Sequence, residues 1–406
     1  MMKKKRFRGI FCAVPAWLEQ TRAQMAFSRL GRKPPELMWK VCAFCPARRA
    51  EAHGVKIGHW FFLIGGYESI DRVLSVVDVF DLKKRRWSDR IAMPQEAPQT
   101  HLGIACDEAR FIYTVGGQAG PQCSPAVADC FVWDLQTRVW DRLPSLPQPR
   151  YSPTVKLWRG RLHALSGAKS DRWTSALDHW SIAVAGGRAL EDRWREEVPI
   201  PKGGPHRTSV VCDDKLYVLG GQDGDIKPIA GDSQYTCDHN TPLETLYPDS
   251  FVMETETGPW KRVSPMPAAR THTESEITIG QYAVTVGGNE GRHRLSDLIQ
   301  VYDSRSDRWR IAGRLPYPMK TPAVYHEGWL YAVTGQRSRS FDDLRPGEIL
   351  SSVWRAKFDP AADWTNQISG PSHLGRAGSD HVATKGNELP REFTDTRFIL
   401  RLSRSF

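Results

Sequence analysis

Polar side chains recur at one position of a repeated sequence pattern, directly after a pair of small residues. The segments YTVGGQ (113–118), YVLGGQ (217–222) and YAVTGQ (331–336) each carry an apolar run into a glycine turn and a glutamine. The amide of glutamine or asparagine both donates and accepts hydrogen bonds, so it suits hydroxyl or peptide groups of a ligand. Across six such segments this position holds Tyr67, Gln118, Ala168, Gln222, Asn289 and Gln336.

A second set of basic and imidazole side chains precedes another apolar run in each segment. It consists of His53, His101, Arg150, His206 with Arg207, Arg270 with His272, and Lys320. Arginine offers a planar fork of donors to a carboxylate, so the two sets together favour an anionic or hydroxyl-rich ligand. The alternative is structural, with the amides satisfying turn backbone and Arg and His bracing neighbouring loops.

Cysteine spacing gives little support to metal chemistry. Of the eight cysteines, Cys42 and Cys45 form the only C-x-x-C, and no second pair stands at zinc-ligand spacing. We therefore predict ordinary thiols, with neither a metal nor a cofactor. Cys123 and Cys237 lie in two long loops and could pair in an oxidising compartment, but free thiols fit equally well.

The elements that would position these residues repeat along the chain. Pairs of small residues begin at positions 65, 116, 166, 220, 287 and 334 and define six units. In each unit a β-type run precedes the pair, and most units then continue with an acid and a tryptophan six positions later, as in DLKKRRW (81–87) and DSRSDRW (303–309). Prolines follow and end the outer strand, because proline cannot donate to a sheet ladder.

Each unit therefore predicts four antiparallel strands, named a to d in chain order. Such a sheet has two apolar faces and no helix to cover them, so six sheets cover one another when they are arranged radially. We predict an all-β fold, a six-bladed β-propeller. The glycines supply positive φ at the turn, and the strand d tryptophan fills the wedge that widens between blades.

Gly-Gly after strand b, an aromatic residue and Asp on strand c, and Trp on strand d resemble Kelch repeats over about residues 36–365. The third unit departs most, with Ser166-Gly167 for the glycines and a c–d hairpin spread over Trp180 to Trp194. The segments RYSPTVKLWRGRLHALSG, LDHWSIAV and IPKGGPHR are also similar to plant Kelch-repeat proteins that carry an N-terminal membrane anchor.

The resemblance implies where a ligand would bind. In Kelch propellers the residue after the glycine pair, and the residues just before strand a, face the mouth of the central channel. The ligand-binding residues implied in this sequence are Tyr67, Gln118, Arg150, His206, Arg207, Gln222, Arg270, His272, Asn289 and Gln336.

The ends of the chain suggest how the ring closes. We expect a basic leader over residues 1–34, the propeller over 35–368 and a tail over 369–406. The segment Leu37 to Val41, with Trp39, resembles a strand d and is predicted to complete blade six. The competing interpretation places a C-terminal strand d at Trp364.

The net charge of +10 belongs to the leader. Residues 1–50 contain twelve Lys and Arg but two acidic residues, and the remainder is balanced, so we predict no nucleic-acid binding by the propeller. The apolar run from Ile10 to Leu18 is too short to span a bilayer. It fits a secretory signal, an organelle transit peptide or a disordered tail. The compartment stays open, with the secretory pathway (Golgi or membrane-associated) slightly favoured over organelle or cytoplasm and membrane association expected through the leader.

Enzymatic precedents among Kelch propellers are not matched by motif. Copper radical oxidases need a Tyr, a Cys and two His around the metal, and iron-binding members use Glu-x3-Asp-x3-His, whereas EGRHRLSD (290–297) has the wrong order and spacing. Sugar epimerisation needs only one or two acid–base residues, and His206, His272 and Glu274 are expected near the mouth. We predict a monomeric, non-enzymatic module that binds a protein segment or a glycan. The alternative is a carbohydrate-active epimerase or lyase using the same pocket.

Overall fold

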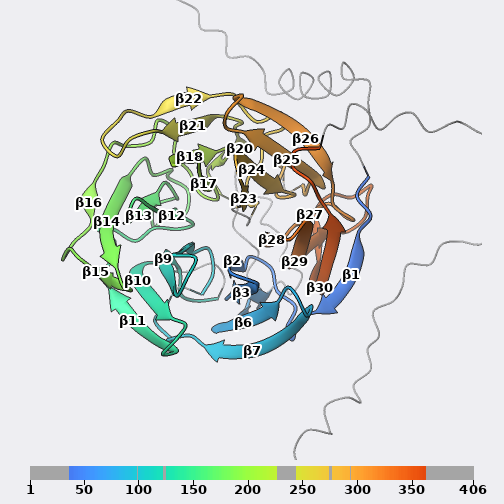
Figure 1. Cartoon of the computed structure of the whole chain (residues 1–406), viewed down its shortest axis with the longest axis horizontal. Helices are drawn as coiled ribbons and strands as arrows, with labels where there is room; N and C mark the ends of the chain where they lie inside the picture. The colour runs from blue at the N-terminus through green and yellow to red at the C-terminus, as the bar shows by residue number, and fades with distance from the viewer. Residues whose placement is uncertain are drawn as a thin grey trace, which may run out of the picture. The chain divides into compact units, whose positions relative to one another are not determined.

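The chain folds into a ring of antiparallel sheets around a central channel (Figure 1). The structure is a computed structural model that describes residues 36–97, 99–121, 125–225, 244–273, 277–292 and 294–362. Over these residues six main sheets follow one another around the ring, and their strands pair in antiparallel fashion. The predicted six-bladed β-propeller is confirmed.

The first three blades each run outward from a strand at the channel. Blade one contains β2 (His53–Ile57), β3 (Trp60–Ile64), β6 (Val76–Asp81) and β7 (Arg86–Ala92), and the small hairpin of β4 (Tyr67–Ser69) and β5 (Arg72–Val73). Blade two contains β8 (Gly103–Cys106), β9 (Phe111–Gln118), β10 (Ala126–Asp134) and β11 (Val139–Leu143). Blade three contains β12 (Thr154–Trp158), β13 (Arg161–Leu165), β14 (His179–Ala185), β15 (Arg188–Ala189) and β16 (Arg195–Glu196).

The last three blades repeat this order. Blade four contains β17 (Thr208–Cys212), β18 (Lys215–Leu219), β21 (Ser250–Met253) and β22 (Lys261–Val263), with the small pair β19 (Gln222–Asp223) and β20 (Thr245–Leu246). Blade five contains β23 (Ile277–Ile279), β24 (Tyr282–Val286), β25 (Leu298–Asp303) and β26 (Arg308–Arg314). Blade six contains β27 (Met319–Lys320), β28 (Ala323–His326), β29 (Trp329–Ser338), β30 (Pro346–Lys357) and β1 (Lys40–Phe44).

An N-terminal strand closes the ring. The outermost strand of blade six is β1, which pairs antiparallel with β30 so that Lys40 lies opposite Arg355 and Phe44 opposite Ser352. The closure is confirmed, but the strand lies three residues later than the predicted Leu37 to Val41. The shift arises because Trp39 precedes the strand and donates its indole N–H to the carbonyl of Arg314 in blade five, at 2.7 Å. Trp364 lies outside the described residues.

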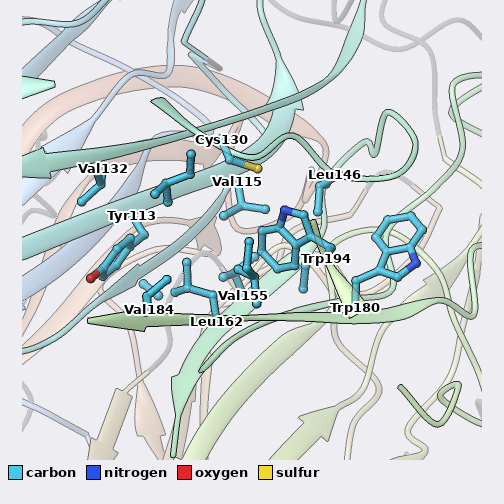
Figure 2. Close-up of a cluster of buried hydrophobic side chains, with 14 residues drawn as sticks. Tyr113, Val115, Cys130, Val132, Leu146, Val155, Leu162, Trp180, Val184 and Trp194 are labelled. Carbon is cyan, nitrogen blue, oxygen red and sulfur yellow. The ribbon is translucent and has the colours of Figure 1, made fainter. Parts of the chain in front are cut away.

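Tryptophans fill the wedges between neighbouring blades. Each of six buried apolar clusters between blades includes one tryptophan that lies in strand d or directly before it, and these are Trp39, Trp87, Trp140, Trp194, Trp260 and Trp309. Figure 2 shows the cluster between blades two and three, where Trp194 lies among Val115, Leu146 and Trp180. The indole N–H of Trp194 donates to the carbonyl of Pro144 at 2.8 Å, so the ring also ties blade three to the end of blade two.

The small-residue pairs turn the chain where strand b ends. The first residue of all six pairs has a φ between 56° and 63°, including the two that are not glycine, Ser166 (63°) and Thr334 (57°). At Gly65 an added Cβ would lie 1.7 Å from the carbonyl oxygen of Gln99. This position therefore needs a left-handed backbone and, at Gly65, the absence of a side chain.

Several predictions concern residues outside the described ranges. These include the leader (1–34), the tail (369–406), and the pairing of Cys123 with Cys237. Within the described ranges, no helix has the length and apolar character needed to cross a membrane.

Candidate functional site

The residues after the small-residue pairs form bridges at the top of each blade. Tyr67 pairs with Ala50, Gln118 with Thr100, Asn289 with Thr271, and Gln336 with Lys320, so strand b is tied to the chain that leads into strand a. The side chains at this position lie inside the protein. Gln118, Gln222 and Gln336 are all fully buried.

The buried amides bond to neighbouring loops and to one another. Gln118 accepts from the hydroxyl of Tyr67 at 3.2 Å, which links blades one and two. Gln222 donates from Nε2 to the carbonyl of Gly224 at 2.9 Å and to Oδ1 of Asp225 at 3.0 Å. The amide of Gln222 therefore fixes the start of its own b–c loop.

The three predicted arginines lie against the b–c loops of their own blades. Arg150 stacks on Trp180, 4.5 Å from the ring centroid, and donates to Asp178 at 2.8 Å. Arg207 donates to the carbonyl of Asp249 at 3.0 Å. Arg270 lies 3.6 Å from Glu290, and burial lowers the pKa of its guanidinium to about 10. These contacts connect the lead-in of strand a to the loop above it.

The residues that follow the bridging positions before strand a, such as Ala50, Thr100 and Thr271, form an inner ring. Glu51, His101, Ser152, His206 and His272 occupy this position in blades one to five, and each has a positive φ, between 46° and 56°. A non-glycine residue pays roughly 1–2 kcal/mol for this backbone conformation, and such strained residues cluster at functional sites. The same strained turn, repeated in five blades, brings the five side chains to the channel.

Electrostatic pairing stabilises the blade one side of the inner ring. Glu51 accepts hydrogen bonds from His101 Nε2 and from Lys320 Nζ. Burial opposes ionisation of Glu51, but His101 and Lys320 outweigh it and hold the pKa of the carboxyl well below its usual value. The carboxylate therefore joins the lead-ins of blades one, two and six.

Imidazoles gather at blades four and five of the inner ring, next to His101, whose ring centroid is 5.2 Å from that of His206. The rings of His206 and His272 stack with their centroids 3.4 Å apart and their planes at 21°. His206 Nδ1 lies 3.0 Å from Ser152 Oγ, and Nε2 lies 3.1 Å from the hydroxyl of Tyr151. Burial, and then the adjacent His206, hold the pKa of His272 well below its ordinary value, so this ring is neutral at physiological pH.

Two charged residues from the b–c loops complete this side. Asp225 Oδ2 lies 3.5 Å from His206 Nε2 and accepts from Arg172 Nη2 at 3.1 Å. Arg172 also donates to the hydroxyl of Tyr151 at 2.8 Å. Burial by itself would raise the pKa of Asp225. The nearby His206 and Arg172 lower it by more, so the carboxyl stays ionised.

The inner ring opens onto the channel. A cavity of about 40 Å³ is lined by His53, Ser152, His206, Arg207 and His272, among others. Gly54 also lines a larger cavity of about 440 Å³, so the two are neighbours along β2. Of the ten predicted ligand-binding residues, His206, Arg207 and His272 reach the smaller cavity. The other seven are not among the residues that line it, and these are Tyr67, Gln118, Arg150, Gln222, Arg270, Asn289 and Gln336.

Sequence reasoning did not single out several members of this arrangement. Glu51 and Ser152 occupy the same place before strand a as His101, His206 and His272, so aligning the units at this position would have found them. Asp225 and Arg172 lie in b–c loops of unequal length. No spacing rule connects them to the histidines.

The fold and the site define a six-bladed propeller with a ring of polar side chains, most of them ionisable, at one end of its channel. The family model described as Kelch motif matches residues 112–147, from β9 to just beyond β11. A Kelch repeat-containing protein of Arabidopsis thaliana is 42% identical over 332 residues, covering 80% of this chain and 77% of that protein. The chain belongs to the Kelch-repeat proteins.

More distant relatives share the repeats. Kelch-like protein 35 of Mus musculus is 22% identical over 378 residues, which cover 90% of this chain and 56% of the mouse protein. The solved structure of YjhT superposes with a TM-score of 0.59 at 12% identity, covering 77% of this chain and 96% of that one. At this identity the structural likeness concerns the fold alone.

Proposed function

We propose that this Kelch propeller is a non-enzymatic binding module that recognises a protein segment through its blade-top loops. The observation that carries the proposal is a pair of exposed aromatic side chains on b–c loops of opposite blades. Trp173 of blade three is 39% exposed and Phe341 of blade six is 64% exposed. Figure 1 shows these blades facing each other across the channel.

Ordered loops support both aromatic residues. The backbone N–H groups of Trp173 and Thr174 donate to Oδ1 of Asp171, at 2.9 and 2.8 Å, which closes a turn beneath the indole. The indole also lies against Gly224 of blade four, where an added Cβ would come within 2.7 Å of it. Because the loop is already ordered, binding through Trp173 loses little conformational entropy.

The loop of blade six is built in the same manner. Ser340 Oγ accepts from the backbone N–H groups of Asp342 at 3.2 Å and Asp343 at 2.9 Å. Phe341 lies beside Tyr317, with 6.0 Å between ring centroids. Aromatic side chains of this kind are enriched among the residues that contribute most to protein–protein affinity.

The ten predicted residues have a supporting role in this proposal. Arg150, Gln222 and Arg270 contact the b–c loops, and Tyr67, Gln118, Asn289 and Gln336 tie strand b to the chain before strand a. His206, Arg207 and His272 present polar groups at the small cavity. A partner segment that crosses the mouth would contact the aromatic residues at its two ends and this polar floor between them.

Selection of peptides tests the proposal. The full chain is used to select from a displayed random-peptide library, and the affinity of an enriched peptide is measured by calorimetry. Trp173→Ala and Phe341→Ala should each weaken binding at least tenfold, or about 1.4 kcal/mol. Leu190→Ala is the matched control, because Leu190 is 66% exposed and lies in the c–d hairpin of blade three, away from its b–c loop.

Three outcomes contradict the proposal. A double variant of Trp173 and Phe341 that binds the peptide like the wild type would move the site elsewhere. Equal losses in the Leu190 control would show that the effect is not specific to the blade tops. A glycan array that yields saturable ligands while no peptide is enriched would replace the protein segment by a carbohydrate.

A further inference from the structure

Two imidazoles and a carboxylate meet at the mouth of the channel. His206 precedes β17, His272 precedes β23, and Asp225 follows β19. Each offers one ligand atom, and the three atoms lie within 4.8 Å of one another. The three side chains are 4–7% exposed, so the group is enclosed by protein.

These side chains have the chemistry of a metal site. Imidazole nitrogen and carboxylate oxygen bind zinc and other late first-row divalent cations at about 2.0–2.2 Å. Two ligand atoms at that distance from one tetrahedral ion are about 3.4 Å apart, and His206 Nε2 and Asp225 Oδ2 are 3.5 Å apart. We propose that His206, Asp225 and His272 bind one late first-row divalent cation of the zinc class.

The surroundings orient two of the three ligands. Ser152 Oγ lies 3.0 Å from Nδ1 of His206, on the side of the ring away from Asp225. Gln222 Nε2 donates to Oδ1 of Asp225 at 3.0 Å, which leaves Oδ2 toward His206. Hydrogen bonds of this kind fix the tautomer of a metal-binding histidine and the direction of a metal-binding carboxylate.

The third ligand has an unsatisfied nitrogen. Nδ1 of His272 is buried and has no hydrogen-bond partner among the described residues. A buried polar atom without a partner destabilises the fold, and coordination through this atom would supply the missing partner. Stacked imidazoles direct their nitrogens in parallel, so coordination of a shared ion requires His272 to rotate out of its stack on His206.

The site has room for an ion, and Arg172 already supplies a positive charge beside Asp225. The cavity beside His206 and His272 measures about 40 Å³, enough for one water or a small cation with an open position. Arg172 donates to the same oxygen of Asp225 at 3.1 Å and balances its charge. A carboxylate oxygen has two lone pairs, so Asp225 can retain Arg172 while it coordinates the ion.

Metal titration of the full chain tests the site directly. The protein is stripped with a chelator, Co²⁺ is added while its visible absorption is recorded, and Zn²⁺ is then used to displace it. We expect one saturable equivalent per chain with the absorption of a low-coordinate cobalt site. A chain that binds no Co²⁺ or Zn²⁺ at one-to-one stoichiometry overturns the proposal without any variant.

Variants then locate the ion. Asp225→Asn and His272→Gln should each weaken Zn²⁺ binding at least tenfold, and Ser152→Ala should weaken it 10–100-fold, as losses of supporting hydrogen bonds do. His163→Gln removes a buried histidine of blade three, outside this group, and should leave the affinity unchanged. Unchanged affinity in Asp225→Asn, with circular dichroism showing a folded chain, overturns the assignment. The peptide selection does not depend on this result.

Discussion

Removal of β1 should open the closed ring and lower its stability. Deleting residues 1–35 leaves Trp39 and the strand in place, whereas deleting residues 1–46 removes both. The first truncation should unfold like the full chain. The second should lose a large part of its stability, because blade six then lacks its outer strand and blade five loses its contact with the Trp39 indole.

The magnitude follows from the contacts of this segment. The β1–β30 register contains four residue pairs, and net contributions near 1 kcal/mol per backbone hydrogen bond give about 4 kcal/mol. Trp39 is half-buried in the cluster between blades five and six, so its loss should cost about 2 kcal/mol, below the 3–5 kcal/mol typical of fully buried aromatic residues. A total near 6 kcal/mol is a large share of the 5–15 kcal/mol that stabilises most domains.

Denaturant unfolding followed by tryptophan fluorescence measures the difference. In the full chain, Trp39→Ala should reproduce about a third of the stability lost in the longer truncation. Trp39→Phe should lose mainly the hydrogen bond to Arg314, about 1 kcal/mol. Met38→Ala is the control, because Met38 is 78% exposed. Equal unfolding midpoints for the two truncations would refute the closure energetics.

Three further predictions concern stability. Trp309→Ala should destabilise by about 2 kcal/mol, as for Trp39, since the half-buried indole packs between blades four and five and donates to a carbonyl at 2.8 Å. A loss under about 1 kcal/mol would place it at the surface. Burial lowers the pKa of His163 to about 3 and that of His179 to about 4. Below about pH 6.5 the unfolded chain therefore binds more protons than the folded chain. The free energy of unfolding should fall from there toward about pH 3. His163→Gln should reduce this slope by about 1.4 kcal/mol per pH unit, and an unchanged slope in denaturant midpoints between pH 6 and 4 would contradict the assignment. Thr334→Gly should stabilise the fold by about 1 kcal/mol, because it relieves a positive φ and removes a buried hydroxyl with no partner among the described residues. Ser166→Gly should stabilise it less, because Ser166 donates to a carbonyl at 2.7 Å. Equal thermal shifts for the two variants would contradict this.

The repeat itself could be predicted from the sequence because its signals are local. A left-handed turn needs glycine or a tolerated substitute, and the six turn positions share one backbone conformation even at Ser166 and Thr334. A tryptophan six residues after an acid marks a hairpin whose tryptophan packs against the preceding blade, as Trp140 and Trp309 do. These features depend on φ and on strand alternation, so chain order is enough to find them.

Closure was predictable in kind but not in register. The spare tryptophan near the N-terminus indicated a missing strand d, and the ring is indeed closed by β1. The first paired residue, Lys40, depends on the reach of the Trp39 indole to a carbonyl of blade five. Such a contact between residues 275 positions apart is fixed only when the ring has formed.

The chemistry of the channel mouth was decided by the tertiary structure. The sequence predicted polar residues after most of the small-residue pairs but could not tell that the glutamines at this position are fully buried. It also could not bring Glu51 to Lys320, or Asp225 to His206 and His272, because these groups come from different blades or from a loop of irregular length. Side chains meet at a channel only through the packing of whole blades, and a buried charge takes its properties from neighbours that the local sequence does not contain.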